Sequence, residues 1–587
     1  MFAQVFFKII KLAIIFWVLL GVCLTWQTTE SYSRYVLAKA IEAKSYEFIS
    51  HEQHSIKFAA KDGRTYLVSP KGLIRGPLIK ATVGQLKINA IQSFTQSSLL
   101  TLSLSGLVIV FLFNKGKKNS KQKQLRGSTR VEKSILVKQL KQEKVIADFN
   151  LADVPIPNET LNQHFLICGT TGTGKSIAIT EMLSQIRSKG QRAVVYDVEG
   201  SFVPKFYRPG KDILLNPLDA RSPYWSLWQE CHEIYEFESA AASLIPMPAY
   251  TNDNFFIQAA RLVFATIASE MRLQERRSHM TLLKNLVSLS DETLRSLTEN
   301  TIAESLTSGE AGKMVQSIKA TLANYAKTLL YLSDAPSPTP FSIKKWIEKS
   351  ESDSWIFISS NEKIRESLNP LISFWLDTAI GATLALTPGQ SKTWFVLDEL
   401  DSLQPLPYLK DGLARGRKYG ACFMLGFQDI NQLAKKYGDK DAQTICALLN
   451  TKLLFRAATS EAAQWMSRSL GSQEIIETNE GLSYGAHETR DGVNIQSHKS
   501  FSPVVMDAEC LTLPNLECFF KLSGNYPVTK LKLEWRQAAQ KEPAFIQREN
   551  INNSFRLDDV SKGCNPDLPA AKNVENKVPD IPILFDF

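Results

Sequence analysis

The stretch Gly169-Thr170-Thr171-Gly172-Thr173-Gly174-Lys175-Ser176 decides the fold of the largest part of this chain. It fits the pattern G-x-x-x-x-G-K-[ST], and the apolar segment 164–168 and the helical pattern 176–189 supply the strand and helix that should flank such a loop. Glycines let the backbone fold closely around a phosphate, so that consecutive N–H groups and the helix N-terminus point at the anion. We therefore expect a site for a nucleoside triphosphate such as ATP, with Lys175 at the β- and γ-phosphates and the Ser176 hydroxyl as a ligand of Mg²⁺.

Two later strands are expected to end in side chains that hydrolyse the nucleotide. The apolar segment 393–397 runs into Asp398 and Glu399. Asp398 would hold the Mg²⁺ shell through water, and Glu399 would polarise the attacking water. The next apolar segment ends at Gln428, which is placed to touch the γ-phosphate or the lytic water. The alternative for Gln428 is a cap on a surface strand.

The spacing of the apolar segments predicts an α/β fold. Short apolar segments separated by helical lengths are typical of a mostly parallel sheet covered on both faces. In this chain they lie at 192–197, 355–358, 393–397, 422–425 and 452–455. The stretch 228–332 carries helical patterns and few β-branched runs, so it predicts an inserted all-α domain. The nucleotide-binding domain is accordingly expected at 149–227 and 333–535.

Residues 1–113 predict a membrane anchor. Two apolar runs, at about 5–26 and 94–113, are long enough to span a bilayer. The segment 27–93 between them carries a hairpin signal at Asp62-Gly63 and predicts a small α/β domain. The first run could instead be a signal peptide, but no small-x-small cleavage site follows it. We therefore favour two retained transmembrane helices.

The charges after the second run predict the orientation of this anchor. Residues 115–144 contain eleven Lys and Arg against Glu132 and Glu143, an excess equal to the net charge of +9 of the whole chain. Such an excess beside a span marks the cytoplasmic side of a membrane. The N-terminus, the basic linker 114–148 and the nucleotide site are thus expected in the cytoplasm, and the segment 27–93 in the periplasm.

The cysteine pattern bears on disulfides and zinc, and the composition of residues 536–587 bears on the order of the last segment. The eight cysteines are scattered singly with no C-x-x-C pair, which indicates neither a disulfide framework nor a zinc site. Residues 536–587 are polar without sustained periodicity and predict a flexible tail. Its apolar and acidic end, 583–587, is either a docking peptide or a segment without a role.

Four further strings carry a family resemblance: Asp197-Val198-Glu199-Gly200, Leu397-Asp398-Glu399, Gly416-Arg417-Lys418-Tyr419-Gly420 and Gly426-Phe427-Gln428-Asp429-Ile430-Asn431-Gln432-Leu433. With these strings, the two spans and the inserted all-α domain, the chain resembles a type IV secretion coupling protein of the TraD/TraG class, in the HerA–FtsK group of RecA-like motor ATPases. One departure is Gln163, at a place where many members carry an arginine.

The resemblance implies a multi-pass protein of the bacterial inner membrane that works as a homo-hexameric ring. Such a ring hydrolyses ATP and pumps single-stranded plasmid DNA, bound to a relaxase and other relaxosome proteins, into the type IV secretion channel during conjugation. The resemblance also assigns Arg417 as the finger that acts on the ATP of the adjacent subunit, and Gln428 as the γ-phosphate sensor.

Two other functions stay open. The chain could be a type IV secretion receptor that passes protein effectors, or a membrane-anchored, nucleotide-dependent scaffold that hydrolyses slowly. The presence of Lys175, Asp398, Glu399, Gln428 and Arg417 together argues against a purely structural role. A chromosome-segregation pump is disfavoured by the compact two-span anchor.

Overall fold

The computed structural model describes residues 2–49, 55–119, 123–248, 254–273, 277–287, 290–299, 301, 303–307, 312–332, 340–349, 352–360, 362–389, 392–483, 492–536 and 539–548. The chain divides into a small unit, Met1–Gln124 with Ile475–Lys499, and a large unit, Leu125–Glu474 with Ser500–Phe587. The expected docking end at 583–587 lies outside the described residues.

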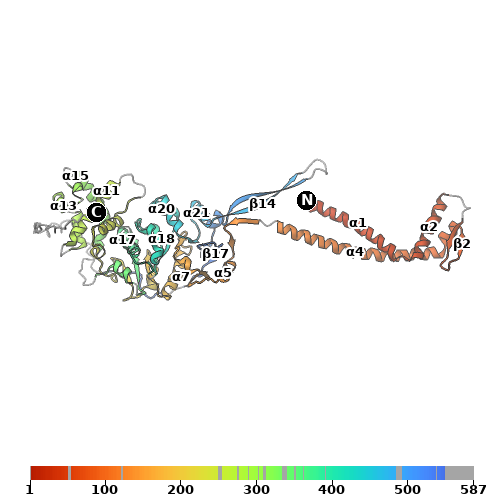
Figure 1. Cartoon of the computed structure of the whole chain (residues 1–587), viewed down its shortest axis with the longest axis horizontal. Helices are drawn as coiled ribbons and strands as arrows, with labels where there is room; N and C mark the ends of the chain where they lie inside the picture. Colours follow the sequence, from red (N-terminus) through yellow and green to blue (C-terminus); the bar gives the residue numbers. More distant parts are fainter. Residues whose placement is uncertain are drawn as a thin grey trace, which may run out of the picture. The chain divides into compact units, whose positions relative to one another are not determined.

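Two long apolar helices dominate the small unit (Figure 1). Helix α1 (Phe2–Thr28) packs against α4 (Pro77–Asn119), and both are long and apolar enough to cross a membrane. The rings of Trp17 and Phe94 meet edge to face at 5.3 Å, and Trp17 Nε1 donates to Ser98 Oγ at 2.8 Å. The second apolar helix begins well before residue 94, because residues 77–93 continue the same helical run.

The segment between these two helices folds around a core of its own. Helix α2 (Ser31–Ile49) is followed by the antiparallel hairpin of β1 (Ile56–Ala59) and β2 (Thr65–Val68), and then by α3 (Pro70–Arg75). Gly63 has φ +84° in the hairpin turn, which confirms the Asp62-Gly63 signal. The buried residues of this core are Val36, Ala43, Ile56, Phe58, Leu73 and Ile79.

A ten-stranded sheet runs through the large unit in the order β4-β17-β16-β13-β7-β12-β11-β8-β10-β9. The strands from β13 to β9 are parallel, whereas β16 pairs antiparallel with both β13 and β17. The predicted parallel strands are thereby confirmed. Their bounds are β4 (Arg130–Val131), β7 (Phe165–Cys168), β8 (Arg192–Asp197), β9 (Ile213–Leu215), β10 (Trp355–Ser359), β11 (Thr393–Leu397), β12 (Ala421–Phe427), β13 (Thr451–Leu454), β16 (Glu517–Lys521) and β17 (Val528–Lys532).

Both faces of this sheet are buried, which explains why its strands are apolar at every position. On β11, Trp394 and Val396 enter one core with α7 (Lys175–Ser188), and Phe395 and Leu397 enter the opposite core. Alternate side chains of a strand point to opposite faces, so a strand covered on both sides needs apolar residues throughout. The core that holds Phe395 and Leu397 also contains buried side chains of α17 (Arg365–Leu384), α20 (Asp439–Leu448) and α21 (Ser460–Leu470).

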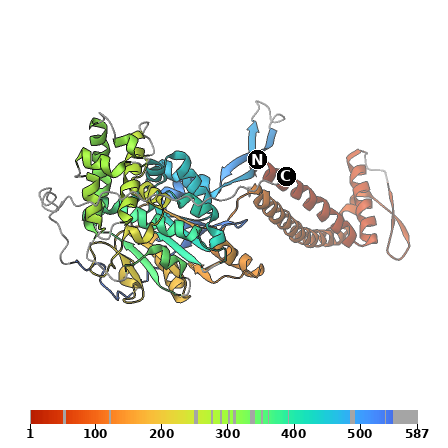
Figure 2. The same ribbon diagram turned by 60° about the vertical axis from the view of Figure 1, so that its left-hand side comes forward.

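The regular elements described between β9 and β10 are helices, and two isolated β-bridges join Trp225 to Phe341 and Asp219 to Gln547. Helices α11, α13 and α15 lie together where Figure 1 labels them, and the yellow-green helices of the same part of the chain lie together in Figure 2. The predicted helical insertion is therefore confirmed as a feature of the fold. Its elements are α9 (Leu227–Glu230), α10 (Ile234–Leu244), α11 (Phe255–Glu270), η1 (Met271–Leu273), α12 (His279–Val287), α13 (Asp291–Thr298), α14 (Glu304–Thr307), α15 (Gly312–Ala326), η2 (Lys327–Tyr331) and α16 (Ile343–Glu348).

The expected basic linker 114–148 differs in the structure, because most of it is folded. Helix α4 continues to Asn119, β3 (Lys123–Gly127) joins a three-stranded sheet with β14 (Ser472–Ser483) and β15 (Gly492–Pro503), and β4 extends the large sheet beside β17. Helix α5 (Lys133–Gln142) buries Leu136 and Leu140, which lie four residues apart on one helix face. The many lysines of this segment suggested a solvated linker and concealed this packing.

The expected flexible tail 536–587 contains an ordered segment. The described segment 539–548 lies along the large unit: the Lys541 N–H donates to Pro204 O at 2.7 Å, and the Ala220 N–H donates to Ile546 O at 2.8 Å. Asp219, which is fully buried, accepts the Ile546 N–H at 3.1 Å. The segment 539–548 makes these three contacts through its own backbone groups, so its side-chain pattern did not indicate them.

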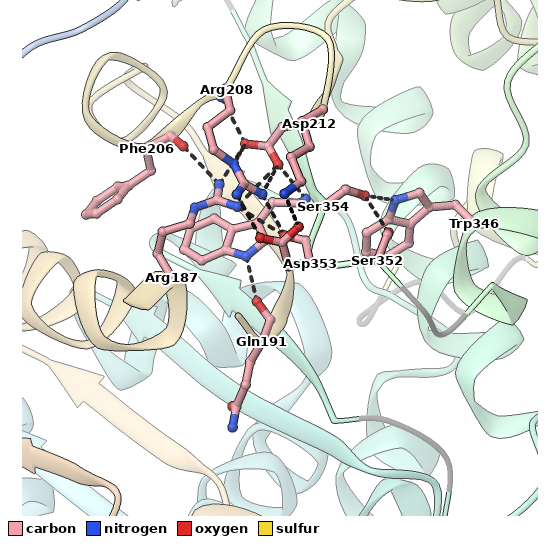
Figure 3. A network of polar contacts seen from close by, with 11 residues as sticks. Arg187, Gln191, Phe206, Arg208, Asp212, Trp346, Ser352, Asp353 and Ser354 are labelled. Carbon is pink, nitrogen blue, oxygen red and sulfur yellow. Dashed lines mark hydrogen bonds and ion pairs between the residues drawn. The ribbon is translucent and has the colours of Figure 1, made fainter. Parts of the chain in front are cut away.

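A polar network fixes the amino ends of β9 and β10 (Figure 3). The buried carboxylate of Asp212 accepts from Arg187 at 2.7 Å, from Arg208 at 3.1 Å and from the Trp355 N–H at 2.9 Å. The Arg187 guanidinium also lies 3.6 Å from the centre of the Trp355 ring. Asp353 accepts from Arg208 at 2.8 Å. Because Arg187 belongs to α7, this network holds the far end of the helix that follows the glycine loop.

Candidate nucleotide-binding site

The glycine loop joins β7 to α7 and packs tightly against the end of β13. Gly169 has φ +154°, and a Cβ at this position would lie 2.5 Å from the Cβ of Phe455, so a larger residue would displace backbone. The Gly169 N–H donates to Phe427 O at 3.4 Å, and the Thr170 N–H donates to Arg456 O at 2.9 Å. The neighbouring strands thus fix the loop at the carboxyl edge of the sheet, where open α/β sheets bind ligands.

Lys175 and Ser176 begin α7 beside a cavity of about 350 Å³. Lys175 Nζ donates to the carbonyls of Gly169 at 2.7 Å and Thr170 at 3.2 Å, which holds the ammonium group over the loop. The cavity is lined by Thr171, Gly172, Gly174, Lys175, Ser176, Ile177, Val198, Glu199, Asp398, Glu399 and Gln428. The two motifs predicted to meet are therefore brought together. The other loop residues, Gly169, Thr170 and Thr173, are not among the described residues that line this cavity.

Asp398 follows β11 and faces the start of α7. Ser176 Oγ lies 3.4 Å from Asp398 Oδ2, and Asp398 Oδ1 is buried without a hydrogen-bond partner among the described residues. Burial, reinforced by the nearby carboxylate of Asp197, raises the pKa of Asp398 to about 7. An unpaired carboxylate oxygen next to a hydroxyl is a donor set that suits a hard cation such as Mg²⁺. The residues present therefore fit the expected metal.

Glu399 and Gln428 lie at the ends of adjacent strands and bond to each other. Gln428 Nε2 donates to Glu399 Oε1 at 2.5 Å, and both residues line the cavity. The position of Gln428 in the cavity favours a role in the site over the surface cap. The strands can approach this closely because Gly426 has no side chain: a Cβ there would lie 2.1 Å from the carbonyl oxygen of Asp398.

Arg417 does not reach the cavity of its own chain. It lies in η5 (Gly416–Tyr419), is exposed, and precedes β12, whereas Gln428 follows β12. A strand of this length spans about 20 Å, so the two residues lie at opposite ends of β12. Arg417 is at the amino end of the strand and Gln428 is at the carboxyl end. The structure thus separates Arg417 from the other predicted site residues.

Two charged residues near the site were missed by the sequence motifs. Asp401 accepts the backbone N–H of Gln428 at 3.4 Å, and burial together with the charge of Glu399 raises the pKa of Asp401 to about 6. Arg365, the first residue of α17, lies 3.9 Å from Glu399 Oε2. Asp401 was visible as a third carboxylate in the string 398–401, but Arg365 is more than thirty residues upstream, and no local pattern indicates it.

Asp197 fixes the backbone turn that carries Val198 and Glu199, two residues that line the cavity. Its buried carboxylate accepts from the backbone N–H groups of Ser201 at 2.8 Å, Phe202 at 2.7 Å and Val203 at 2.8 Å. These bonds fold the chain after β8 into a tight turn that presents Glu199 to the cavity. A role in backbone positioning therefore accounts for the first residue of the string Asp197-Val198-Glu199-Gly200.

A parallel sheet with a phosphate-binding loop, two acidic strand ends and a helical insertion defines a RecA-like P-loop nucleotide-binding protein. Residues 148–534 match the family model described as the type IV secretion-system coupling protein DNA-binding domain. The chain is 32% identical over 548 residues to the coupling protein TraD of Escherichia coli (strain K12), covering 92% of this chain and 76% of TraD. The chain belongs to the type IV secretion-system coupling proteins.

Solved structures of a relative agree with this assignment. The unbound monoclinic form of the bacterial conjugative coupling protein TrwBdeltaN70 is 30% identical, with a TM-score of 0.66 over 73% of this chain and 97% of the other. The plasmid coupling protein TrwB in complex with ADP and Mg²⁺ is also 30% identical, with a TM-score of 0.65 over 73% and 98% of the two chains. The similarity supports the RecA-like architecture with its helical insertion.

Proposed function

We propose that this protein is an inner-membrane coupling ATPase that hydrolyses ATP with Mg²⁺ to move single-stranded plasmid DNA, bound to a relaxase, into a type IV secretion channel. The observation that carries the proposal is the convergence of Lys175, Ser176, Asp398, Glu399 and Gln428 on one cavity. Relatives of the same family have been solved with the ATP analogue ADPNP and with ADP and Mg²⁺. The arrangement therefore supports a site for hydrolysis in addition to binding.

Each residue of the site has a distinct role in this proposal. Lys175 and the loop N–H groups neutralise the phosphates, and Ser176 and Asp398 hold Mg²⁺, which supplies charge stabilisation when it is bound. Glu399 accepts a proton from the attacking water, and Gln428 detects the γ-phosphate. The Gln428–Glu399 hydrogen bond of 2.5 Å couples the two residues, so that a change in the contacts of one alters the position of the other.

The position of Arg417 leads us to propose a homo-hexameric ring. An arginine at the opposite edge of the sheet cannot stabilise charge in its own site, but it can reach a neighbour's site if subunits pack edge to edge in a ring. A ring also provides a channel for a polyanion. We place α1 and α4 in the membrane, the segment between them in the periplasm and the large unit in the cytoplasm, as the basic residues after the second run predict.

The proposal is tested by ATP hydrolysis of the full-length protein in lipid nanodiscs, with and without single-stranded DNA. We expect DNA to raise the rate several-fold, and Lys175→Ala and Arg417→Ala each to abolish it. Mixing the two inactive variants should restore part of the rate, because an intact Arg417 on a Lys175→Ala subunit then faces an intact loop on an Arg417→Ala subunit. Failure of the mixture to recover would contradict a finger that acts between subunits.

The same measurement separates the two alternatives. A robust rate that ignores DNA would favour a receptor for protein effectors, which uses the same motor with another cargo. A rate near zero at every protein concentration would favour a nucleotide-dependent scaffold. Binding of a fluorescent ATP analogue distinguishes such a scaffold from a protein that has lost its fold.

A further inference from the structure

The first turn of α17 contacts the residue that we assign as the general base. Arg365 begins this helix, and its Nη1 lies 3.9 Å from Glu399 Oε2. A cation in the first turn faces the positive end of the helix dipole and so disfavours the helix. The helix thus presents a guanidinium at a position where helix stability alone would favour an acidic or neutral residue.

Both carboxylate oxygens of Glu399 are engaged in this arrangement. Oε1 accepts from Gln428 Nε2 at 2.5 Å, and Oε2 faces Arg365. A general base must direct a free lone pair at the water whose proton it takes, within hydrogen-bonding distance. The amide on one oxygen and the guanidinium near the other therefore hold the Glu399 carboxylate in one orientation.

A second group of contacts ties α17 to the backbone behind Glu399. Asn369, one turn after Arg365, donates from Nδ2 to Ser402 O at 2.9 Å. Ser402 Oγ in turn donates to Glu399 O at 2.8 Å and lies 2.9 Å from the hydroxyl of Tyr196. The side chain and the backbone of Glu399 are thus both held by the same end of one helix, so a displacement of that end would change both.

The rest of α17 packs against the inserted helices. It contacts α10, α16 and η2, and its buried Asp377 accepts from Ser243 Oγ of α10 at 2.6 Å and from the Tyr408 N–H at 2.7 Å. Pro370 lies inside the helix and has no N–H to give to the carbonyl of Glu366, so the first turn is held by fewer backbone bonds than the remainder. Helix α17 therefore joins the inserted helices to the site through a weakened first turn.

We propose that Arg365 is a positioning residue that holds Glu399 in this orientation as a resting state, and that a movement of the inserted helices releases the contact through α17. This inference concerns the regulation of the site and rests on the proposed ATPase function. It assigns α17 as the element that connects the inserted helices to the general base, and it adds no new group to the reaction itself.

The test compares steady-state ATP hydrolysis by the full-length protein and its Arg365→Ala variant in nanodiscs without DNA or relaxase. We expect Arg365→Ala to raise the cargo-free kcat about threefold or more, with KM for ATP unchanged, because the resting contact is lost while the phosphate contacts stay. Arg365→Lys should remain near the wild-type rate, since it keeps the charge. Lys410→Ala is the matched control: it breaks an exposed ion pair of 2.7 Å with Asp441, away from the cavity.

A cargo-free kcat of Arg365→Ala at or below the wild-type value overturns the inference, since a residue that assists hydrolysis or only stabilises the fold cannot give an increase when it is removed. If Arg365→Ala fails to bind a fluorescent ATP analogue, Arg365→Gln takes its place with the same expected and opposing results. A wild-type protein that stays inactive even when single-stranded DNA is added would count against the proposed function, whereas a wild-type protein that is active with DNA beside an unchanged variant counts against the role of Arg365 alone.

Discussion

At the scale of single residues, the carboxyl group of Asp398 links the nucleotide site to the stability of the protein. Its pKa is about 7 in the folded state against 3.8 for an ordinary aspartate, because the group is buried near Asp197. Between these two values the folded state holds a proton that the unfolded state has released. The stability of the free protein therefore falls as the pH rises from about 4 to 7.

We expect Asp398→Asn to stabilise the protein in the absence of nucleotide and Mg²⁺. The gain should grow between pH 5 and 7, level off above pH 7 and reach on the order of 1–3 kcal/mol at pH 8, because the amide never ionises. Thermal denaturation in buffers of pH 5 and pH 8 measures it. The same variant should lose the stabilisation that Mg²⁺ with ATP gives to the wild type. An equal gain at both pH values would contradict the assigned ionisation.

At the scale of elements, the contact between β11 and β12 determines whether the site residues meet. Gly426 lies just beyond the Leu397–Leu425 pair of these strands, and a Cβ would come within 2.1 Å of Asp398 O. One of the two strands would have to move to relieve this clash. Asp398 and Glu399 come directly after β11 and Gln428 directly after β12, so the movement would displace them. The spacing of the strands thus depends on one glycine.

Gly426→Ala should therefore reduce both stability and hydrolysis. We expect a loss of about 2–3 kcal/mol, typical of overpacking in a buried position, and a rate of hydrolysis near background. Chemical denaturation and an ATPase assay measure the two effects. Gly84→Ala is the control. Gly84 lies in helix α4, and a Cβ at this position would meet nothing within 4 Å. A Gly426→Ala protein with wild-type activity would refute the close approach of the two strands.

At the scale of the whole molecule, the boundaries of the large unit decide which fragments will fold. Strand β4 covers the edge of β17, with Arg130 paired to Val528, and α5 buries Leu136 and Leu140. A fragment that starts at Val145 lacks Arg130, Leu136 and Leu140. The domain boundary predicted at residue 148 thus separates β4 and α5 from β17, against which both pack.

We expect a fragment that starts at Lys123 to be more stable than one that starts at Val145. Each buried leucine contributes about 2 kcal/mol, and an uncovered β17 would leave a strand edge free for aggregation. Thermal denaturation and size-exclusion chromatography of the two fragments provide the comparison. Equal midpoints and equally monodisperse elution would show that β4 and α5 add nothing to the large unit.

The carboxyl end allows a parallel test of the segment 539–548. A chain that ends at Arg536 leaves Asp219 without the Ile546 N–H and Arg221 without the carbonyls of Pro543 and Ala544. We expect it to lose about 1–3 kcal/mol relative to a chain that ends at Arg548, because buried charged groups lose hydrogen-bond partners. The chain that ends at Arg548 serves as the control and should melt with the full-length protein.

The sequence by itself determined the parallel strands and the main site residues, because each depends on a local pattern. Segments such as 192–197 and 393–397 are apolar at every position, and a strand buried on both faces needs that composition. The loop 169–176 needs its glycines and its lysine at fixed spacing. The carboxyl ends of adjacent parallel strands meet at one edge, so the meeting of Asp398, Glu399 and Gln428 with the loop could be foreseen.

Only the tertiary structure decided the features that depend on partners far away in the chain. The pairing of β4 and the placement of 539–548 use backbone groups, which every residue carries, so no side-chain pattern announces them. The contact of Arg365 with Glu399 joins residues on different elements, and its charge alone is that of any surface arginine. Local composition determines an element, whereas the partner of a backbone edge or a single charge is fixed only when the elements pack.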